Sequence, residues 1–113
     1  MTDLTLQQCT SLSSDEIVEL NHAETTALLQ QLAPRWQLDT KAEAINHTFI
    51  FENYYQTMAF ANVIAQIAHQ QDHHPDLLLS YNRCTVTYST HSIATLSIKD
   101  FICAAKINAA QNL

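Results

Sequence analysis

The spacing of apolar residues along this chain changes in a repeated order, and that order limits the folds it can adopt. A helical pattern begins at Asn21 and ends at Pro34, period-two alternation follows over residues 36–51, and a long helical pattern occupies residues 52–71. A second alternating stretch over 76–90 precedes a last helix. Each alternating stretch accommodates two strands and a turn. The sequence therefore predicts helix, strand, strand, helix, strand, strand, helix: an α+β fold with an antiparallel four-stranded sheet and three helices on one face.

Capping residues mark where two of these helices begin. Asn21 can cap the first helix while Glu24 reaches back to it, and SIKD at 97–100 repeats this reciprocal spacing before the last helix. Residues 1–20 are polar with scattered leucines. We therefore expect an N-terminal arm over 1–20 and a single domain over 21–113.

Composition excludes several classes of function. The formal net charge is −6 with only five Lys and Arg, so the chain lacks the cations that bind nucleic acid or an anionic membrane. No apolar run approaches membrane-spanning length, and the first residues lack the pattern of a signal peptide. Glycine is absent, which excludes glycine-rich phosphate loops. The three cysteines, Cys9, Cys84 and Cys103, are widely spaced, so we expect a cytoplasmic protein without a disulfide framework.

Half of the six histidines lie in one segment, HQQDHHPD at 69–76. Pro75 confines His74 to an extended conformation, which predicts that the long helix ends near His73. His69 and His73 are four residues apart, so we expect both imidazoles on one helix face. Histidine has an unperturbed pKa of about 6.5 and can therefore give and take a proton near neutral pH.

Three interpretations of this cluster are compatible with its spacing. The histidines could be solvated, or could cap the negative end of the helix. They could bind zinc as in a zinc hydrolase, with Asp72, Asp76 or His91 as a further ligand, although neither HExxH nor a cysteine pair is present. They could form a proton-transfer site for a neutral organic substrate.

His91 favours the proton-transfer interpretation. It directly follows the last predicted strand, in YSTHS. If the last two strands pair antiparallel through the YNR turn at 81–83, their far ends meet, and His73, His74 and His91 converge at one edge of the sheet. Asp100, in the first turn of the last helix, either joins them or only completes the helix cap.

The segments around these histidines form a fairly specific combination: DHHP at 72–75, YN at 81–82, TVTYSTHS at 85–92 and Asp100, with LLQQLAPRW at 28–36 and FIFENYYQTMAF at 49–60 upstream. This combination resembles the pterin-4a-carbinolamine dehydratase family, also called dimerisation cofactors, over about residues 20–110. The resemblance implies the fold described above. It also implies dehydration of 4a-hydroxytetrahydrobiopterin to quinonoid dihydrobiopterin, which recycles tetrahydrobiopterin for aromatic amino acid hydroxylases.

The resemblance further implies catalytic or substrate-contacting roles for His73, His74 and His91. It implies no metal and no cofactor, because the pterin is the substrate. A homodimer or homotetramer and a functional link to an aromatic amino acid hydroxylase are expected. The alternative on the same fold is a non-catalytic module for protein interaction, assembly or coactivation, in which the histidines are incidental; the presence of all three motif histidines favours catalysis.

Three further residues are expected at the substrate site by the same resemblance. Pro75 shapes the site, Asp100 matches the acidic position after the TH motif, and His69 occupies the position four residues before the first motif histidine, where members vary. Members usually carry glycine and leucine where this chain has Thr95 and Leu96. If that glycine takes a positive φ, Thr95 costs about 1 kcal/mol or changes the loop that places Asp100.

Overall fold

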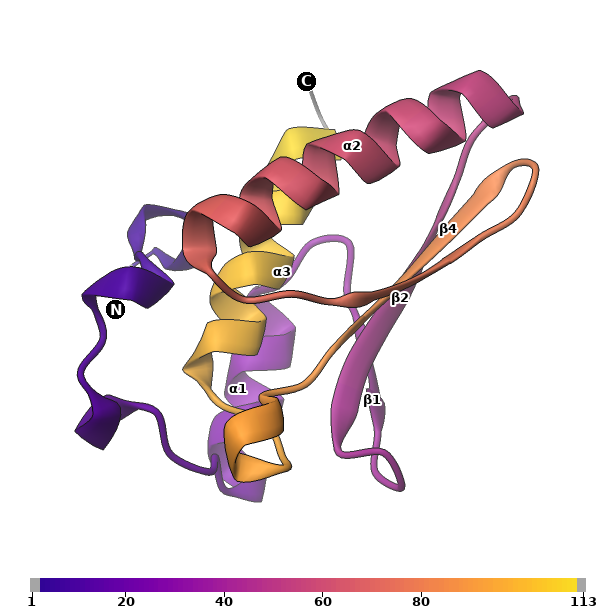
Figure 1. Ribbon diagram of the computed structural model, residues 1–113. Coiled ribbons are helices and arrows are strands. Elements are labelled where there is room, and N and C mark those ends of the chain that lie inside the picture. Colours follow the sequence, from indigo (N-terminus) through magenta and orange to yellow (C-terminus); the bar gives the residue numbers. More distant parts are fainter. Residues whose placement is uncertain (1–2, 112–113) are drawn as a thin grey trace.

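The computed structural model describes residues 3–111, which form the predicted order of three helices and four strands (Figure 1). The elements are α1 His22–Gln31, β1 Gln37–Asp39, β2 Ala44–Ile50, α2 Tyr54–Gln71, β3 Asp76–Leu79, β4 Arg83–Tyr88 and α3 Ile98–Gln111. The predicted fold class is therefore confirmed. No helix within residues 3–111 is both long and apolar enough to cross a membrane.

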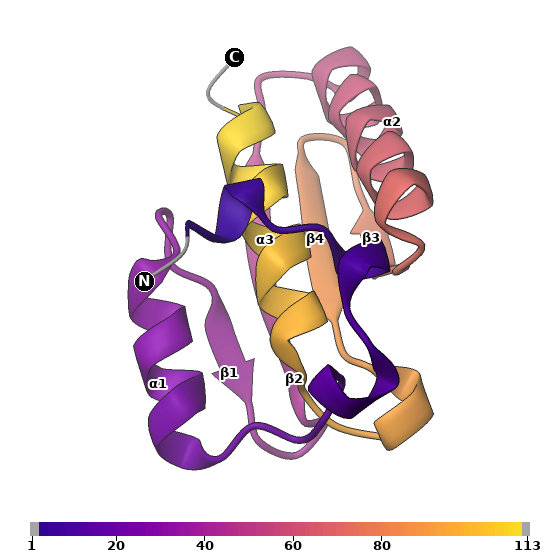
Figure 2. The same ribbon diagram turned by 90° about the vertical axis from the view of Figure 1, so that its left-hand side faces the viewer.

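The four strands form one antiparallel sheet in the order β1-β2-β4-β3. The predicted turn at residues 81–83 joins β3 to β4, with the Ser80 N–H donating to the Arg83 carbonyl at 2.9 Å. Figure 2 shows all three helices in front of the same face of the sheet. The register places Asp76, the first residue of β3, opposite Thr87 near the end of β4.

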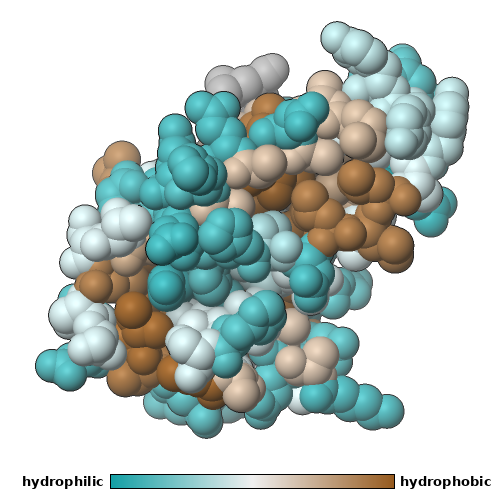
Figure 3. Space-filling view, in the orientation of Figure 1, coloured by the Kyte–Doolittle hydropathy of each residue, from teal (hydrophilic) through white to brown (hydrophobic). Residues whose placement is uncertain are grey.

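Strand alternation separates the core from the outer face of the sheet. Cys84, Val86 and Tyr88 of β4 are fully buried beneath the helices, whereas Thr85 projects to the outer face and hydrogen-bonds Thr48 of β2 at 2.8 Å. Because β3 is an edge strand, part of its apolar side-chain area remains uncovered. Figure 3 shows hydrophobic side chains gathered beside α2, over this edge of the sheet.

The long helix α2 ends at Gln71, as the helical pattern over residues 52–71 indicated, and just before the stop near His73 that Pro75 predicted. Asp72 takes a left-handed conformation with φ 50°, and the His73 N–H turns back to donate to the Ala68 carbonyl at 3.1 Å. This arrangement closes a helix C-terminus by satisfying its last carbonyls. The expectation that His69 and His73 share one helix face is wrong, because His73 lies beyond the helix. His69 is exposed, whereas His73 is buried.

The N-terminal segment, residues 3–20, packs onto the helices through three short 3-10 turns, η1 Leu4–Leu6, η2 Cys9–Ser11 and η3 Ser14–Glu16. Leu4 and Cys9 belong to the hydrophobic core. The buried Gln71 side chain, at the end of α2, accepts a hydrogen bond from the Cys9 N–H at 2.8 Å. The arm expected over residues 1–20 is thus, from residue 3, attached to the domain by buried contacts.

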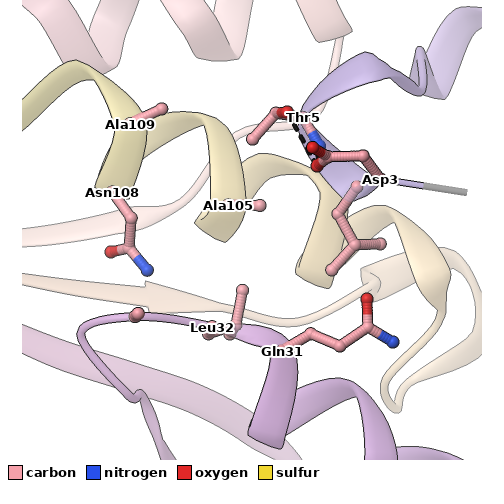
Figure 4. Close-up of a pocket in the computed structure, with 9 residues that line it drawn as sticks. Asp3, Thr5, Gln31, Leu32, Ala105, Asn108 and Ala109 are labelled. Carbon is pink, nitrogen blue, oxygen red and sulfur yellow. Dashed lines mark hydrogen bonds between the residues drawn. The ribbon is translucent and has the colours of Figure 1, made fainter.

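Figure 4 shows η1 close to the end of α1 and to α3, around a hollow of about 180 Å³. Asp3 and Thr5 lie on one side of it, with the Asp3 carboxylate accepting from the Thr5 N–H and hydroxyl. Leu32 and Ala105 lie on the other side. The hollow is therefore bordered by η1, by the end of α1 and by α3.

Candidate active site

Four chain segments meet at one end of the sheet. Antiparallel pairing of β3 with β4 brings the start of β3, which follows the end of α2, beside the end of β4. A short turn, η4 His91–Ile93, then leads to the start of α3. Residues 72–76 and 89–92, distant in sequence, thereby face one another, as the antiparallel pairing predicts.

A pocket of about 310 Å³ opens where these segments meet. We call it the histidine pocket, and its lining residues are Asp72, His73, His74, Pro75, Asp76, Ser89, Thr90, His91, Ser92 and Lys99. All three motif histidines therefore lie around one cavity. Pro75 lines it as well, whereas His69 does not.

His73 is held by hydrogen bonds and by a stacked aromatic ring. Its Nε2 lies 2.7 Å from Oδ1 of Asp100, and its side chain is only 8% exposed. The ring stacks on Tyr88 with centroids 5.1 Å apart, and the Tyr88 hydroxyl donates to the His73 carbonyl at 3.0 Å. Because carboxylate oxygens only accept, this contact favours the Nε2–H tautomer, which leaves Nδ1 with its lone pair.

Asp100 has both of the roles that the sequence left open: it contacts a motif histidine and it completes the cap of α3. Its side chain is fully buried, and while Oδ1 meets His73, Oδ2 accepts from the Ser97 N–H at 3.0 Å and the Thr90 hydroxyl at 2.8 Å. The Thr90 and Ser97 hydroxyls also contact each other at 2.7 Å. One carboxylate therefore caps the start of α3 and orients an imidazole in the pocket.

In the loop before Asp100, the left-handed residue is not Thr95, which the sequence suggested, but its neighbour Ala94. Ala94 has φ 56°, in the left-handed region, whereas Thr95 does not have a positive φ. Thr95 instead pairs with Thr90 in a short antiparallel bridge, accepting from the Thr90 N–H at 3.0 Å. Threonine at 95 is thus compatible with the loop that places Asp100.

The remaining polar groups of the pocket are more accessible. His74 and His91 are exposed, and Lys99 is half-buried at the start of α3. Sequence reasoning did not assign Lys99 or Tyr88 to the site. Tyr88 could have been found, because strand alternation places it on the core face at the end of β4. Lys99 is adjacent to Asp100, but its side-chain direction depends on where α3 begins.

Burial shifts the pKa of two side chains on the core face of the sheet. It raises the pKa of Tyr88, which therefore remains a neutral hydrogen-bond donor to His73. Burial also lowers the pKa of His47, which lies on the core face of β2 between Trp36 and Phe49 and does not line the pocket.

A zinc site requires at least three protein ligands around one point. Among residues 3–111, no group of three or more His, Cys, Asp or Glu side chains is arranged to hold a metal ion. Nε2 of His73 is directed instead to Asp100.

The sequence is similar to known proteins over most of its length. A sequence profile described as pterin 4 alpha carbinolamine dehydratase matches residues 18–110. A protein of Nitrosomonas europaea, provisionally named a pterin-4-alpha-carbinolamine dehydratase, is 49% identical over 107 residues, covering 94% of this chain and 91% of that protein. A protein of Nitrosomonas eutropha with the same provisional name is 53% identical over 89 residues, covering 79% of this chain and 77% of its own.

Solved structures show the same arrangement of elements. The crystal structure of a transcriptional coactivator/pterin dehydratase from Brucella melitensis is 34% identical, with a TM-score of 0.77 over 81% of this chain and 97% of that one. A pterin dehydratase-like protein identified as a RuBisCO assembly factor in the alpha-carboxysome is 23% identical, with a TM-score of 0.58 over 66% of this chain and 86% of its own. The second likeness concerns the fold alone.

Proposed function

This chain belongs to the pterin 4 alpha carbinolamine dehydratase family, and from that premise we propose that it dehydrates 4a-hydroxytetrahydrobiopterin to quinonoid dihydrobiopterin and water. The reaction would recycle tetrahydrobiopterin for aromatic amino acid hydroxylation. The observation that carries the proposal is the meeting of His73, His74 and His91 around one cavity.

The reaction requires two proton transfers on one substrate. The bond between C4a and its hydroxyl oxygen breaks while an acid gives that oxygen a proton, so that water leaves. A base removes a proton from a ring nitrogen, and the nitrogen electrons form the new double bond to C4a. No electron leaves the substrate and no cofactor is needed. We assign the acid and the base to His73 and His91, and either order balances the protons.

The remaining residues of the pocket would support these two. Asp100 fixes the tautomer and the ring orientation of His73, and is therefore a positioning residue. His74, exposed at the rim beside Pro75, would position the pterin by hydrogen bonding. His69 lies outside the pocket lining, so its expected contact with substrate remains a proposal that requires a substrate extending beyond the cavity.

Substitution of the histidines tests this function. We expect His91→Asn and His73→Asn each to lower kcat by about 10²-fold to 10⁴-fold, as is typical for loss of a general acid or base. Turnover is followed by absorbance with freshly generated carbinolamine. His22→Asn, at the exposed start of α1, is the matched control and should retain full kcat. A fully active His73→Asn/His91→Asn double variant would rule the roles out.

A non-catalytic module is the second candidate function. It is favoured by the name of the Brucella melitensis protein, which combines a coactivator with a pterin dehydratase. On that alternative the wild-type chain would not accelerate dehydration above the uncatalysed rate. The histidine substitutions would then leave the measured rate unchanged. The same assay therefore separates the two functions.

The assembly and the cellular setting are part of the proposal. We expect a cytoplasmic homodimer or homotetramer that works together with an aromatic amino acid hydroxylase and binds neither nucleic acid nor membrane. Sedimentation velocity over a hundredfold range of protein concentration measures the assembly, and a monomer at all concentrations would contradict it.

A further inference from the structure

Two of the three cysteines lie in contact although they are distant in the sequence. Sγ of Cys9, in the N-terminal segment, is 3.8 Å from Sγ of Cys103 on α3. Both side chains are buried, with exposed fractions of 3% and 0%. A disulfide places its sulfurs about 2.0 Å apart, so a small shift of the N-terminal segment would bring the pair to bonding distance.

The surroundings of the pair distinguish its two sulfurs. The hydrogen bond between the two thiols lowers the pKa of Cys9 and burial raises it; of the nearby charges, Lys99 and Lys106 lower this pKa and Asp100 raises it. The same contact, together with burial, raises the pKa of Cys103. Cys9 is therefore the sulfur that more readily becomes a nucleophilic thiolate.

The third cysteine provides an internal comparison. Cys84 lies on β4, is as fully buried as Cys103, and burial raises its pKa. Among residues 3–111, only the Cys9 and Cys103 sulfurs contact each other. Burial alone therefore does not separate Cys84 from the pair; the neighbouring sulfur does.

We propose that Cys9 and Cys103 are a redox-active pair that a peroxide converts into an intramolecular disulfide, joining the N-terminal segment to α3. The Cys9 thiolate attacks one peroxide oxygen, the O–O bond breaks, and a sulfenic acid forms; the released hydroxide becomes water with the proton that the Cys9 thiol lost on ionising. The Cys103 sulfur then attacks Cys9, the S–O bond breaks, and the leaving hydroxide takes the Cys103 proton as water. Two thiols are oxidised, one hydrogen peroxide is reduced, and two waters form.

The N-terminal segment also offers a way for peroxide to reach a buried sulfur. Cys9 lies in a three-residue 3-10 turn rather than in the sheet or a long helix. The bonds that hold this turn include the contact of its N–H with Gln71 and that of its sulfur with the Lys99 carbonyl at 3.7 Å. Such a segment can open locally while the core stays folded, which would expose Cys9 before Cys84.

The distribution of basic residues makes the test direct, because trypsin separates the three cysteines. Cleavage after Arg35, Arg83, Lys99 and Lys106 leaves each cysteine in its own peptide. The full-length protein is reduced, desalted, treated with hydrogen peroxide and alkylated in denaturant before digestion. We expect a linked pair of peptides that contain Cys9 and Cys103, while Cys84 is recovered alkylated.

Variants and stability give independent readouts. Cys84→Ala should form the linked peptides as wild type does, whereas Cys9→Ala should leave Cys103 alkylated. The oxidised wild-type chain should also unfold at a temperature several degrees higher than the reduced chain, because the bridge closes a long loop. Oxidation of Cys84 at the same rate as the pair, or a disulfide only between chains, would overturn the proposal. These outcomes do not depend on the proposed dehydratase activity.

Discussion

At the scale of single residues, Asp100 both caps α3 and orients the His73 ring. Replacement by asparagine tests the second role apart from the first. Asparagine keeps an oxygen for the Ser97 N–H and the Thr90 hydroxyl, but it presents an amide donor to Nε2 of His73. That reverses the hydrogen bond and moves the imidazole proton to Nδ1. We expect Asp100→Asn to lower kcat by about 10²-fold while the structure remains folded.

The control for this prediction is Asp76→Asn, the same change at an exposed carboxylate that also lines the pocket. Its kcat should stay close to that of wild type. Urea unfolding of both variants shows that each is folded at the assay temperature. Equal losses of kcat in the two variants would mean that pocket charge matters, and not the orientation of His73.

Ala94 gives a second prediction at this scale. A left-handed conformation is unfavourable for alanine but not for glycine, so Ala94→Gly should raise the free energy of unfolding by up to about 1 kcal/mol. Thr95→Gly should lower it, because Thr95 is buried, has no positive φ and would lose its side-chain contacts. Denaturant titration measures both. If Thr95→Gly instead raised the free energy of unfolding, the assignment of the positive φ to Ala94 and not to Thr95 would be contradicted.

At the scale of elements, η1 tests whether the N-terminal segment belongs to the folded unit. Leu4 is 4% exposed and Leu6, in the same turn, is 74% exposed. We expect Leu4→Ala to destabilise the protein by about 2–3 kcal/mol, through lost burial and the cavity left behind. Leu6→Ala should change stability by less than about 0.5 kcal/mol. Equal effects of the two substitutions, measured by urea unfolding, would show that the segment is a loose arm.

The end of α2 shows why a helix can be predicted while the path of the chain just beyond it cannot. Pro75 correctly indicated that the helix must stop, because the residue before proline avoids helical conformation. The left-handed residue that ends it is Asp72, and aspartate carries a weaker signal for that conformation than glycine. Because the chain turns at Asp72, His73 lies beyond the helix and is buried against Tyr88, apart from the exposed His69.

At the scale of the whole molecule, His47 makes global stability depend on pH. Burial lowers its pKa in the folded protein below the ordinary value near 6.5, so the unfolded chain binds more protons between these two values. Stability from this group is therefore complete above about pH 6.5 and is lost as the pH falls through 6.5 toward the folded pKa.

The corresponding measurement is urea unfolding at several pH values from 8 to 5. His47→Leu fills the space beside Trp36 and Phe49 with an apolar side chain. This variant has no titratable group at position 47. We expect the wild-type chain to lose more stability than this variant between about pH 7 and pH 5. Parallel curves for the two proteins would assign the acid sensitivity to other groups.

Much of the whole arrangement follows from the sequence, because period-two and helical spacing fix the elements and antiparallel pairing fixes which ends meet. His73, His74 and His91 could be placed together for that reason. The double role of Asp100 could not be predicted, since it depends on a loop in which Ala94, and not the suspected Thr95, is left-handed. The burial of Cys9 against α3 could not be predicted either, because the sequence of residues 3–20 does not indicate which helix or strand this segment packs against.

The hydrogen bond between Asp100 and His73 also has a consequence for folding during synthesis on the ribosome. One carboxylate joins the first turn of α3 to the residue just beyond α2, across 27 positions of the chain. A ribosome releases His73 before it releases that carboxylate, so a nascent chain truncated before α3 has this imidazole without its anchor. The imidazole of His73 can therefore be anchored only after α3 has been synthesised and has folded beside α2.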